Sequence, residues 1–259
     1  MHIYIYDTFV SQKKNNSTII KIETRITDLG LNGKIVRLSM LSSLGEVIQN
    51  EIKKGAKTIT VVGNNNIFHN AINVLAYLKS LKQIKADIPL GFIPFGKENN
   101  SLALGLGLNM EEAACDTISA RRIKTFDLAQ ANDHYFLAEA LISSKGTSVN
   151  IDKNYSIEIM GQGEIGIVNL PILSKLPKEI GSNGEDGVLE LFIKTKEGNK
   201  FLSFPNKNIK QSIFSFKDLT INNKTKKVLL DQTIEIAPPL KINISTEKIN
   251  LIISKGLIF

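Results

Sequence analysis

The stretch TITVVGNNNIFHNAINVLAYL, residues 58–78, carries the pattern that decides the fold. Residues 58–62 form a run rich in β-branched side chains, which is typical of buried parallel strands. After a polar turn at residues 63–66, apolar residues recur three and four positions apart, and this spacing predicts an amphipathic helix. A strand, a short turn and a helix in this order form the repeating unit of an α/β domain.

The same unit recurs on both sides of this stretch. Strands are predicted at residues 2–6, 34–39, 58–62 and 89–94, and helices at residues 19–29, 44–52, 68–78 and 109–118. The last helix is expected to begin with an Asn109 cap, and to carry Glu111 and Glu112 in its first turn. Four such repeats predict a parallel sheet that helices cover on both faces.

After about residue 122 the pattern changes to short alternating segments separated by Asn, Gly and Lys turns, which predicts a β-rich region. Strands are expected at residues 155–160, 165–170, 188–194, 212–216, 228–230 and 241–244. The predicted fold class is therefore α/β, with a parallel α/β domain at residues 1–122 followed by an antiparallel, sandwich-like β domain at residues 123–247.

The composition limits the classes of protein that this chain can belong to. Its 259 residues contain no apolar run near the roughly 18 residues that cross a bilayer, and residues 1–9 resemble no secretion leader, so a cytoplasmic protein is expected. Cys115 is the only cysteine, which excludes an internal disulfide. The histidines His2, His69 and His134 are too scattered for a familiar zinc spacing, so no structural metal is expected.

The net charge of +7 favours anionic partners. Phosphates or an anionic lipid or membrane surface would suit it, although lysines retained only for solubility explain it as well. The chain has no tryptophan and no basic stretch interleaved with aromatic residues, so no specific nucleic-acid binding is expected.

Two turns are candidates for phosphate binding, at residues 61–68 and 89–100. Each follows a predicted buried strand and precedes a predicted helix. In parallel α/β sheets, ligands bind beyond the carboxyl ends of the strands, where helix N-termini offer amides and a partial positive charge to phosphate.

These two turns resemble the signature loops of the diacylglycerol kinase catalytic family, whose fold is similar to that of sphingosine kinases and NAD kinases. The first family loop reads Gly-Gly-Asp-Gly-Thr, and residues 63–67 stand in its place as Gly63, Asn64, Asn65, Asn66 and Ile67. The second reads Pro-Leu-Gly-x-x-Pro-x-Gly-Thr-Gly-Asn-Asp, and residues 89–96 match it as far as Gly96. Beyond that point Lys97, Glu98 and Asn100 replace Thr, Gly and Asp, while Asn99 is kept.

The resemblance extends over nearly the whole chain and implies the two-domain lipid-kinase-like fold. Residues 126–137 and 186–191 resemble segments of the family's β domain. Asp231 stands where the family has the first residue of Asp-Gly-Glu, and the last strand, within residues 248–259, is expected to return to the first domain. The helical excursion that the family carries beside its lipid site is replaced by the short segment 143–154.

The resemblance implies an ATP-dependent phosphotransferase that uses ATP and Mg²⁺ to phosphorylate a lipid hydroxyl. It assigns nucleotide binding to Gly63, Asn64, Asn65, Asn66, Ile67, Gly96, Lys97, Asn99 and Asn100. Asn65 and Asp231 are the candidate catalytic residues. Asn65, however, replaces the aspartate of the first loop and cannot act as a base near neutral pH, and Glu98 adds a negative charge beside the expected phosphates.

We therefore expect a degenerate active site, a pseudoenzyme or weak kinase that retains nucleotide or anionic-ligand binding and associates peripherally with membranes. Two alternatives stay open. The chain is an active kinase for a lipid or a small soluble alcohol, or it is a noncatalytic interaction scaffold, for which a homodimer is one expected form.

Several of these residues also have an interpretation without chemistry. Asn66 would cap a helix that begins near Ile67, and His69 would be an ordinary surface histidine. Cys115 would be a small buried residue. The acids Asp127, Asp186 and Asp231 would form turns or end strands.

Overall fold

The computed structural model describes residues 1–84, 87–97, 99–152, 155–173, 184–196 and 209–255. The chain divides into two compact units, the first formed by Met1–Phe126 and Glu247–Phe259 and the second by Asp127–Thr246. Glu98, a residue of the second candidate turn, lies outside the described residues.

The first unit is built on a parallel sheet in the order β2-β1-β3-β4. Its strands are β1 His2–Tyr6, β2 Gly33–Arg37, β3 Thr58–Gly63 and β4 Leu90–Pro94. The sheet continues to β16, Leu240–Ile252, whose Leu251 pairs in parallel with Leu90. All residues of β3 and β4 are buried, as expected for strands that helices cover on both faces.

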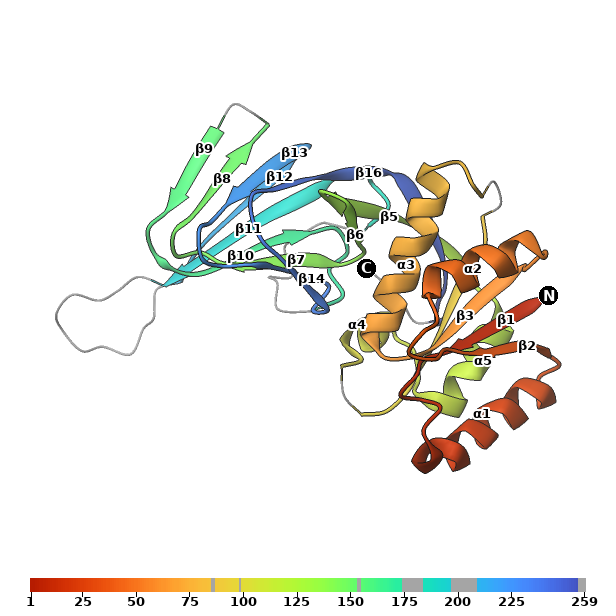
Figure 1. The fold of residues 1–259 in the computed structure, drawn as a ribbon. Helices are drawn as coiled ribbons and strands as arrows, with labels where there is room; N and C mark the ends of the chain where they lie inside the picture. Colours follow the sequence, from red (N-terminus) through yellow and green to blue (C-terminus); the bar gives the residue numbers. More distant parts are fainter. Residues whose placement is uncertain (85–86, 98, 153–154, 174–183, 197–208, 256–259) are drawn as a thin grey trace. The chain divides into compact units, whose positions relative to one another are not determined.

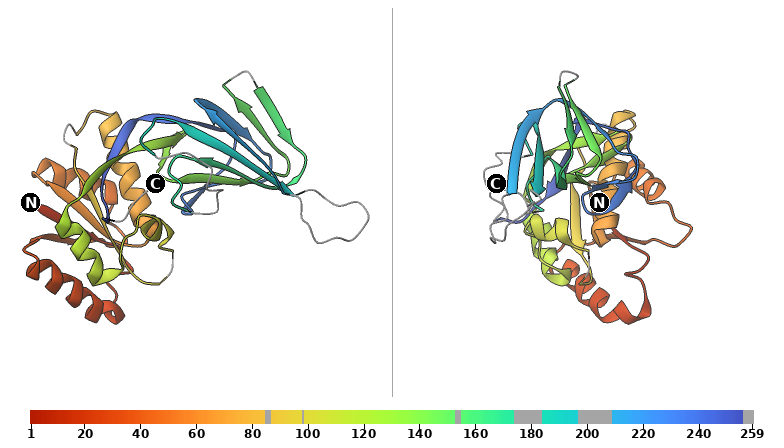
Figure 2. Two further views of the ribbon diagram at one scale, coloured as in Figure 1. Left: turned by 180° about the vertical axis from the view of Figure 1, so that it is seen from behind. Right: turned by 90° about the vertical axis from the view of Figure 1, so that its left-hand side faces the viewer.

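Among the described residues, five α-helices accompany this sheet: α1 Asn16–Asp28, α2 Leu44–Lys53, α3 Asn65–Ser80, α4 Ser101–Gly105 and α5 Ala114–Ala120. Two short 3₁₀ turns, η1 Lys13–Asn15 and η2 Glu111–Ala113, precede α1 and α5. The views in Figures 1 and 2 agree that α2 and α3 cover one face of the sheet and that α1 and α5 cover the other. The predicted α/β class of this half is thereby confirmed.

One predicted helix differs from the structure. Residues 109–118 do not form a continuous helix capped by Asn109, because η2 follows Met110 and Glu111 has a φ of 53°. A positive φ interrupts the helical path, so the α-helix begins only at Ala114. The short helix α4 was not predicted at all, since its sequence SLALG ends in a glycine, is soon followed by Gly107 and shows less than two turns of periodicity.

The second unit is antiparallel. One sheet continues from β16 through β13 Asp218–Asn222 and β8 Thr147–Ile151 to β9 Tyr155–Ile159, and β5 Ile123–Ala131 pairs with β16 and with β6 His134–Phe136. The other has the order β12-β11-β10-β7-β14-β15. Its strands are β7 Glu139–Ser143, β10 Gln162–Val168, β11 Leu189–Lys196, β12 Ile209–Phe216, β14 Val228–Leu230 and β15 Ile234–Ile236.

Apolar side chains from both sheets of this unit share one core, for example Val149 and Leu219 from one sheet and Ile165 and Leu191 from the other. The sandwich-like β architecture is thereby confirmed. The six strands predicted here are present, residues 228–230 with the predicted bounds and the other five with shifted ends, and the structure adds others. One of them is β8, which lies inside segment 143–154 and alternates buried and exposed residues.

No helix among the residues described here is long and apolar enough to cross a membrane.

Candidate functional site

The first candidate turn connects β3 to α3. Asn64 has an extended backbone, with φ −108° and ψ −174°, and its side-chain oxygen accepts a hydrogen bond from the backbone N–H of Asn66 at 3.0 Å. Asn64 is therefore the N-cap of α3. The expectation that Asn66 caps a helix beginning near Ile67 was wrong, because the helix already begins at Asn65.

Gly63, at the end of β3, has no room for a side chain. A Cβ atom there would lie 2.8 Å from Cγ2 of Ile67 and 3.1 Å from Cβ of Asp7. The Gly63 carbonyl also accepts a hydrogen bond from the N–H of Phe95 at 2.7 Å, which joins the first turn to the end of β4. Close packing thus explains glycine at this position, and Ile67 forms part of that packing.

Asn65 is fully buried and joins the two candidate turns. Its side-chain amide donates to Oγ of Ser101 at 2.7 Å, and its side-chain oxygen accepts from the N–H of Leu102 at 3.2 Å. Its backbone N–H donates to the carbonyl of Asn99 at 2.9 Å. All three contacts lead to the beginning of α4, so Asn65 fastens α3 to α4.

The second candidate turn runs from the end of β4 to α4. Gly96 has a φ of 81° and Asn99 a φ of 55°, both in the left-handed region that glycine and asparagine tolerate best. The buried Asn100 donates to the Gly96 carbonyl at 2.8 Å, and Asn99 donates to the side-chain oxygen of Asn66 at 3.2 Å. Lys97 is exposed. Asn64, Asn65, Asn66 and Asn99 are therefore joined in one hydrogen-bonded group, whereas the Asn100 side chain bonds to Gly96 of its own turn.

Amide donors at the starts of α3 and α4 are already bonded within the protein. The N–H of Asn65 bonds to a backbone carbonyl, that of Asn66 to the Asn64 side chain and that of Leu102 to the Asn65 side chain. A phosphate-binding turn instead leaves such amides pointing at the ligand. Two of these three donors are occupied by the very side chains that replace loop residues of the resembled family.

Two carboxylates that the sequence reasoning did not select lie at the same edge of the sheet. Asp7 follows β1 directly, and its Cβ and carboxylate flank Gly63. Glu111 accepts a hydrogen bond from the Gly96 N–H at 3.4 Å. Negative charge at this edge opposes the binding of phosphate. The signal in the sequence for Asp7 was its position immediately after a buried strand.

His69 is buried rather than on the surface, so the surface interpretation was wrong. It lies in the second turn of α3, and Asn73 donates to its carbonyl at 3.0 Å while the Asn73 amide lies 3.1 Å from Nε2 of the imidazole. The neighbouring Phe68 stacks on Phe92 of β4 with ring centroids 4.5 Å apart. Most of the first three turns of α3 is buried, which explains why polar residues there are enclosed.

Asp231, the other catalytic candidate, is fully buried in the second unit. It lies in the turn between β14 and β15 with a φ of 47°. Its carboxylate accepts backbone hydrogen bonds from Leu137 at 2.8 Å, Ala138 at 2.8 Å and Glu139 at 3.1 Å. These contacts give Asp231 a structural role, the anchoring of the start of β7. Asn65 belongs to the other unit, so neither unit contains both catalytic candidates.

The remaining acids and the cysteine have structural surroundings. Asp127 accepts from the N–H of Gly187 at 2.8 Å, and Asp186 accepts from that of Val188 at 3.1 Å, so both organise one turn. Cys115 is buried in the first unit, and this burial raises the pKa of its thiol to about 12. The prediction of a small buried residue is confirmed.

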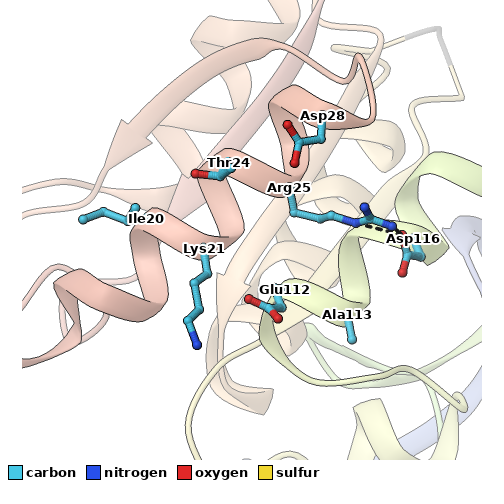
Figure 3. A pocket seen from close by; sticks show the side chains of 8 residues that line it. All are labelled: Ile20, Lys21, Thr24, Arg25, Asp28, Glu112, Ala113 and Asp116. Carbon is cyan, nitrogen blue, oxygen red and sulfur yellow. Dashed lines mark hydrogen bonds and ion pairs between the residues drawn. The ribbon is translucent and has the colours of Figure 1, made fainter.

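The first unit also contains a cavity of about 460 Å³ between α1 and the η2–α5 segment (Figure 3). Its lining contains both charges: α1 contributes Lys21, Arg25 and Asp28, and the facing segment contributes Glu112 and Asp116. Arg25 is already paired with Asp116, whose Oδ1 lies 2.5 Å from Nη2. No residue of the two candidate turns lines this cavity, and its mixed charge gives no preference for an anion.

Within the described ranges, no group of three or more His, Cys, Asp and Glu side chains could hold a metal ion.

Comparison with known proteins gives one family. Residues 3–131 match the family model of the diacylglycerol kinase catalytic domain. The structure is similar to the crystal structure of a diacylglycerol kinase from Bacillus anthracis str. Sterne, with a TM-score of 0.74 and 19% sequence identity over 99% of this chain and 98% of that chain. Two further structures from the same strain give TM-scores of 0.73 and 0.72 at 17% identity, covering 99% of this chain and 97% and 98% of theirs. No curated protein matches the sequence significantly.

Proposed function

The chain belongs to the diacylglycerol kinase catalytic-domain family, and on this premise we propose that it is a divergent lipid-kinase-family protein whose nucleotide turn is closed and whose ATP-dependent phosphotransfer is weak or absent. The observation that carries the proposal is the hydrogen bonding of the turn. The amides of Asn66 and Leu102 are occupied by the side chains of Asn64 and Asn65.

ATP with Mg²⁺ would be the cofactor pair of an active family member. The residues at the two turns do not fit this pair. Asn65 brings no negative charge to a metal or to a hydroxyl proton. Its side-chain nitrogen is bonded to Ser101, and its side-chain oxygen to Leu102. A phosphate would have to displace these bonds, and it would do so beside the carboxylates of Asp7 and Glu111.

The volume of the side chains in the turn also disfavours nucleotide binding. A glycine-rich loop lets the backbone approach phosphate closely because it has no Cβ atoms. Asn64 and Asn66 add side chains at two of these loop positions, and the Asn66 side chain is held by Asn99 at 3.2 Å. The turn is therefore preformed around protein contacts and would need to rearrange before a nucleotide could enter.

A phosphotransfer assay tests this proposal. The wild-type protein is incubated with γ-labelled ATP, Mg²⁺ and diacylglycerol in mixed micelles, and in parallel with a panel of soluble alcohols. The restored variant Asn64→Gly, Asn65→Asp, Asn66→Gly, Ile67→Thr is the positive comparison, and Asn65→Ala is the background. We expect label transfer by the wild type to equal that of Asn65→Ala.

Transfer by the wild type well above the Asn65→Ala background, to either kind of acceptor, would contradict the proposal and make the chain an active kinase. A gain of transfer in the restored variant alone supports the proposal, since it shows that the four substitutions account for the loss. If neither protein transfers label, the wild-type result still stands, and the defect extends beyond the first turn.

A further inference from the structure

A second cavity, of about 500 Å³, lies in the second unit at one end of the six-stranded sheet. It is formed where β7 ends, β10 begins and β11 approaches its own end, three strands that run side by side (Figure 1). Glu164 of β10 lies opposite Ser143 of β7 on one side and Lys194 of β11 on the other. The volume is in the range of small-molecule sites.

Three lysines from different elements converge on this cavity. Lys194 comes from β11, Lys145 from the β7–β8 turn and Lys226 from the connection between β13 and β14. Within the described part of the chain none of the three forms an ion pair, whereas Lys227 and Lys241 of the same unit pair with Glu235 and Asp218. Among the described residues that line the cavity Glu164 is the only acid, so these residues give an excess of two positive charges.

The turns that carry two of these lysines are fastened to each other by Asn223. Its side-chain amide donates to the carbonyl of Lys145 at 3.2 Å and to Oγ1 of Thr147 at 2.8 Å. Its side-chain oxygen accepts from the N–H groups of Thr225 and Lys226, each at 2.8 Å. These hydrogen bonds of Asn223 thus join the two lysine-bearing segments before any ligand arrives.

The segments that carry the lining residues Ser143 and Gly163 are fixed as well. Ser144 donates from Oγ to the carbonyl of Gly161 at 2.7 Å and from its N–H to the carbonyl of Gly163 at 3.0 Å. A Cβ atom on Gly163 would lie 1.8 Å from the carbonyl oxygen of Lys194, so only glycine allows β10 and β11 to approach this closely. A preformed site loses less conformational entropy when it binds a ligand.

We propose that this cavity is an anion site for a ligand that carries one or more phosphate groups. Lysine ammonium groups on flexible stems are common phosphate binders, and the Ser143 hydroxyl and Gln162 amide that line the same cavity can donate further hydrogen bonds. The phosphate can come from a soluble polyphosphate compound or from an anionic lipid headgroup. The inference stands independently of the nucleotide turns, which belong to the other unit.

Calorimetric titration with inorganic pyrophosphate at low ionic strength tests the site. Lys145→Gln and Lys226→Gln are each expected to weaken binding about fivefold, the effect of one lysine beside an anionic group. Lys224→Gln is the matched control, since Lys224 is an exposed lysine of the same connection that does not line this cavity. It should change the affinity less than twofold.

The Glu164→Gln substitution should change the affinity for pyrophosphate in the opposite direction. Removal of the Glu164 carboxylate from the lining should strengthen binding of pyrophosphate, a gain that a merely structural role would not produce. Circular dichroism of each variant verifies that the protein is folded.

A second arm distinguishes the two sources of phosphate. Sedimentation with phosphatidylcholine vesicles, with and without phosphatidic acid, shows whether a lipid headgroup is bound, and a Lys226-dependent difference assigns that binding to this cavity. Pyrophosphate binding without vesicle binding assigns a soluble ligand. The proposal is overturned if the wild type binds neither probe, or if Lys224→Gln weakens binding as much as Lys226→Gln, because the charge then acts diffusely.

Discussion

Replacement of Asn65 by alanine should destabilise the first unit strongly, because this side chain fastens α3 to α4. The variant leaves the buried N–H of Leu102 without its acceptor, which costs about 1–3 kcal/mol, and it removes the bond to Ser101, which is worth about 1 kcal/mol. We therefore expect a loss of about 2–4 kcal/mol in the free energy of unfolding. Asn66→Ala is the matched control, since Asn66 is exposed and its side chain accepts one hydrogen bond, from Asn99.

Urea denaturation followed by circular dichroism at 222 nm measures this loss. The signal reports the first unit, because all α-helices in the described part of the chain belong to it. With a denaturant slope of about 2 kcal/mol per molar, Asn65→Ala should lower the midpoint by about 1–2 M. Asn66→Ala should lose no more than about 0.5 kcal/mol. Equal midpoints for the two variants would refute the fastening role of Asn65, and with it the argument that the turn is closed by that side chain.

Three further results are expected. Asp231→Ala should cost about 3–5 kcal/mol in a calorimetric unfolding experiment, because three backbone N–H groups lose a buried carboxylate, and a loss below about 1 kcal/mol would contradict its anchoring role. Cys115, whose pKa burial raises to about 12, should react with a thiol reagent at pH 8 only after unfolding, and rapid labelling of the native protein would show that the thiol is accessible. Glu51 accepts a hydrogen bond from Lys34 at 2.6 Å, and this bond lowers the pKa of the carboxyl. The stabilisation by this charged pair is present above the pKa of the unfolded state and is lost as the pH falls through the lowered pKa of the folded state. Glu51→Gln should therefore cost about 1–2 kcal/mol at pH 7 and less in acid, and a pH-independent difference would argue against the charged pair.

The first half of the fold was largely predictable from sequence. β1 begins and ends at the predicted residues, and the other strands and first three helices of this unit lie within a few residues of their predictions. A buried strand appears in the sequence as a continuous run of β-branched residues. In a helix that packs on a sheet, apolar residues recur every three to four positions. Both patterns are strong signals in the sequence. Helix α4 and strand β8 were missed because a five-residue helix and a half-exposed strand give only weak patterns in the sequence.

The position of the candidate turns was also predictable, but their internal contacts were not. Asn65 meets Ser101 through the tertiary approach of two turns that are 36 residues apart. Nothing in the local pattern of residues 63–67 indicates that approach. Likewise His69 is buried because of how α3 packs within the unit, which local sequence does not reveal.

Calorimetric titration with ATP and Mg²⁺ tests the closed nucleotide turn most directly. The wild type is compared with the variant Asn64→Gly, Asn65→Asp, Asn66→Gly, Ile67→Thr, which frees the Asn66 amide and restores a carboxylate at the loop position. The account predicts no measurable heat of binding for the wild type and saturable binding for the variant. Saturable binding of ATP by the wild type, with an affinity equal to that of the variant, would contradict it.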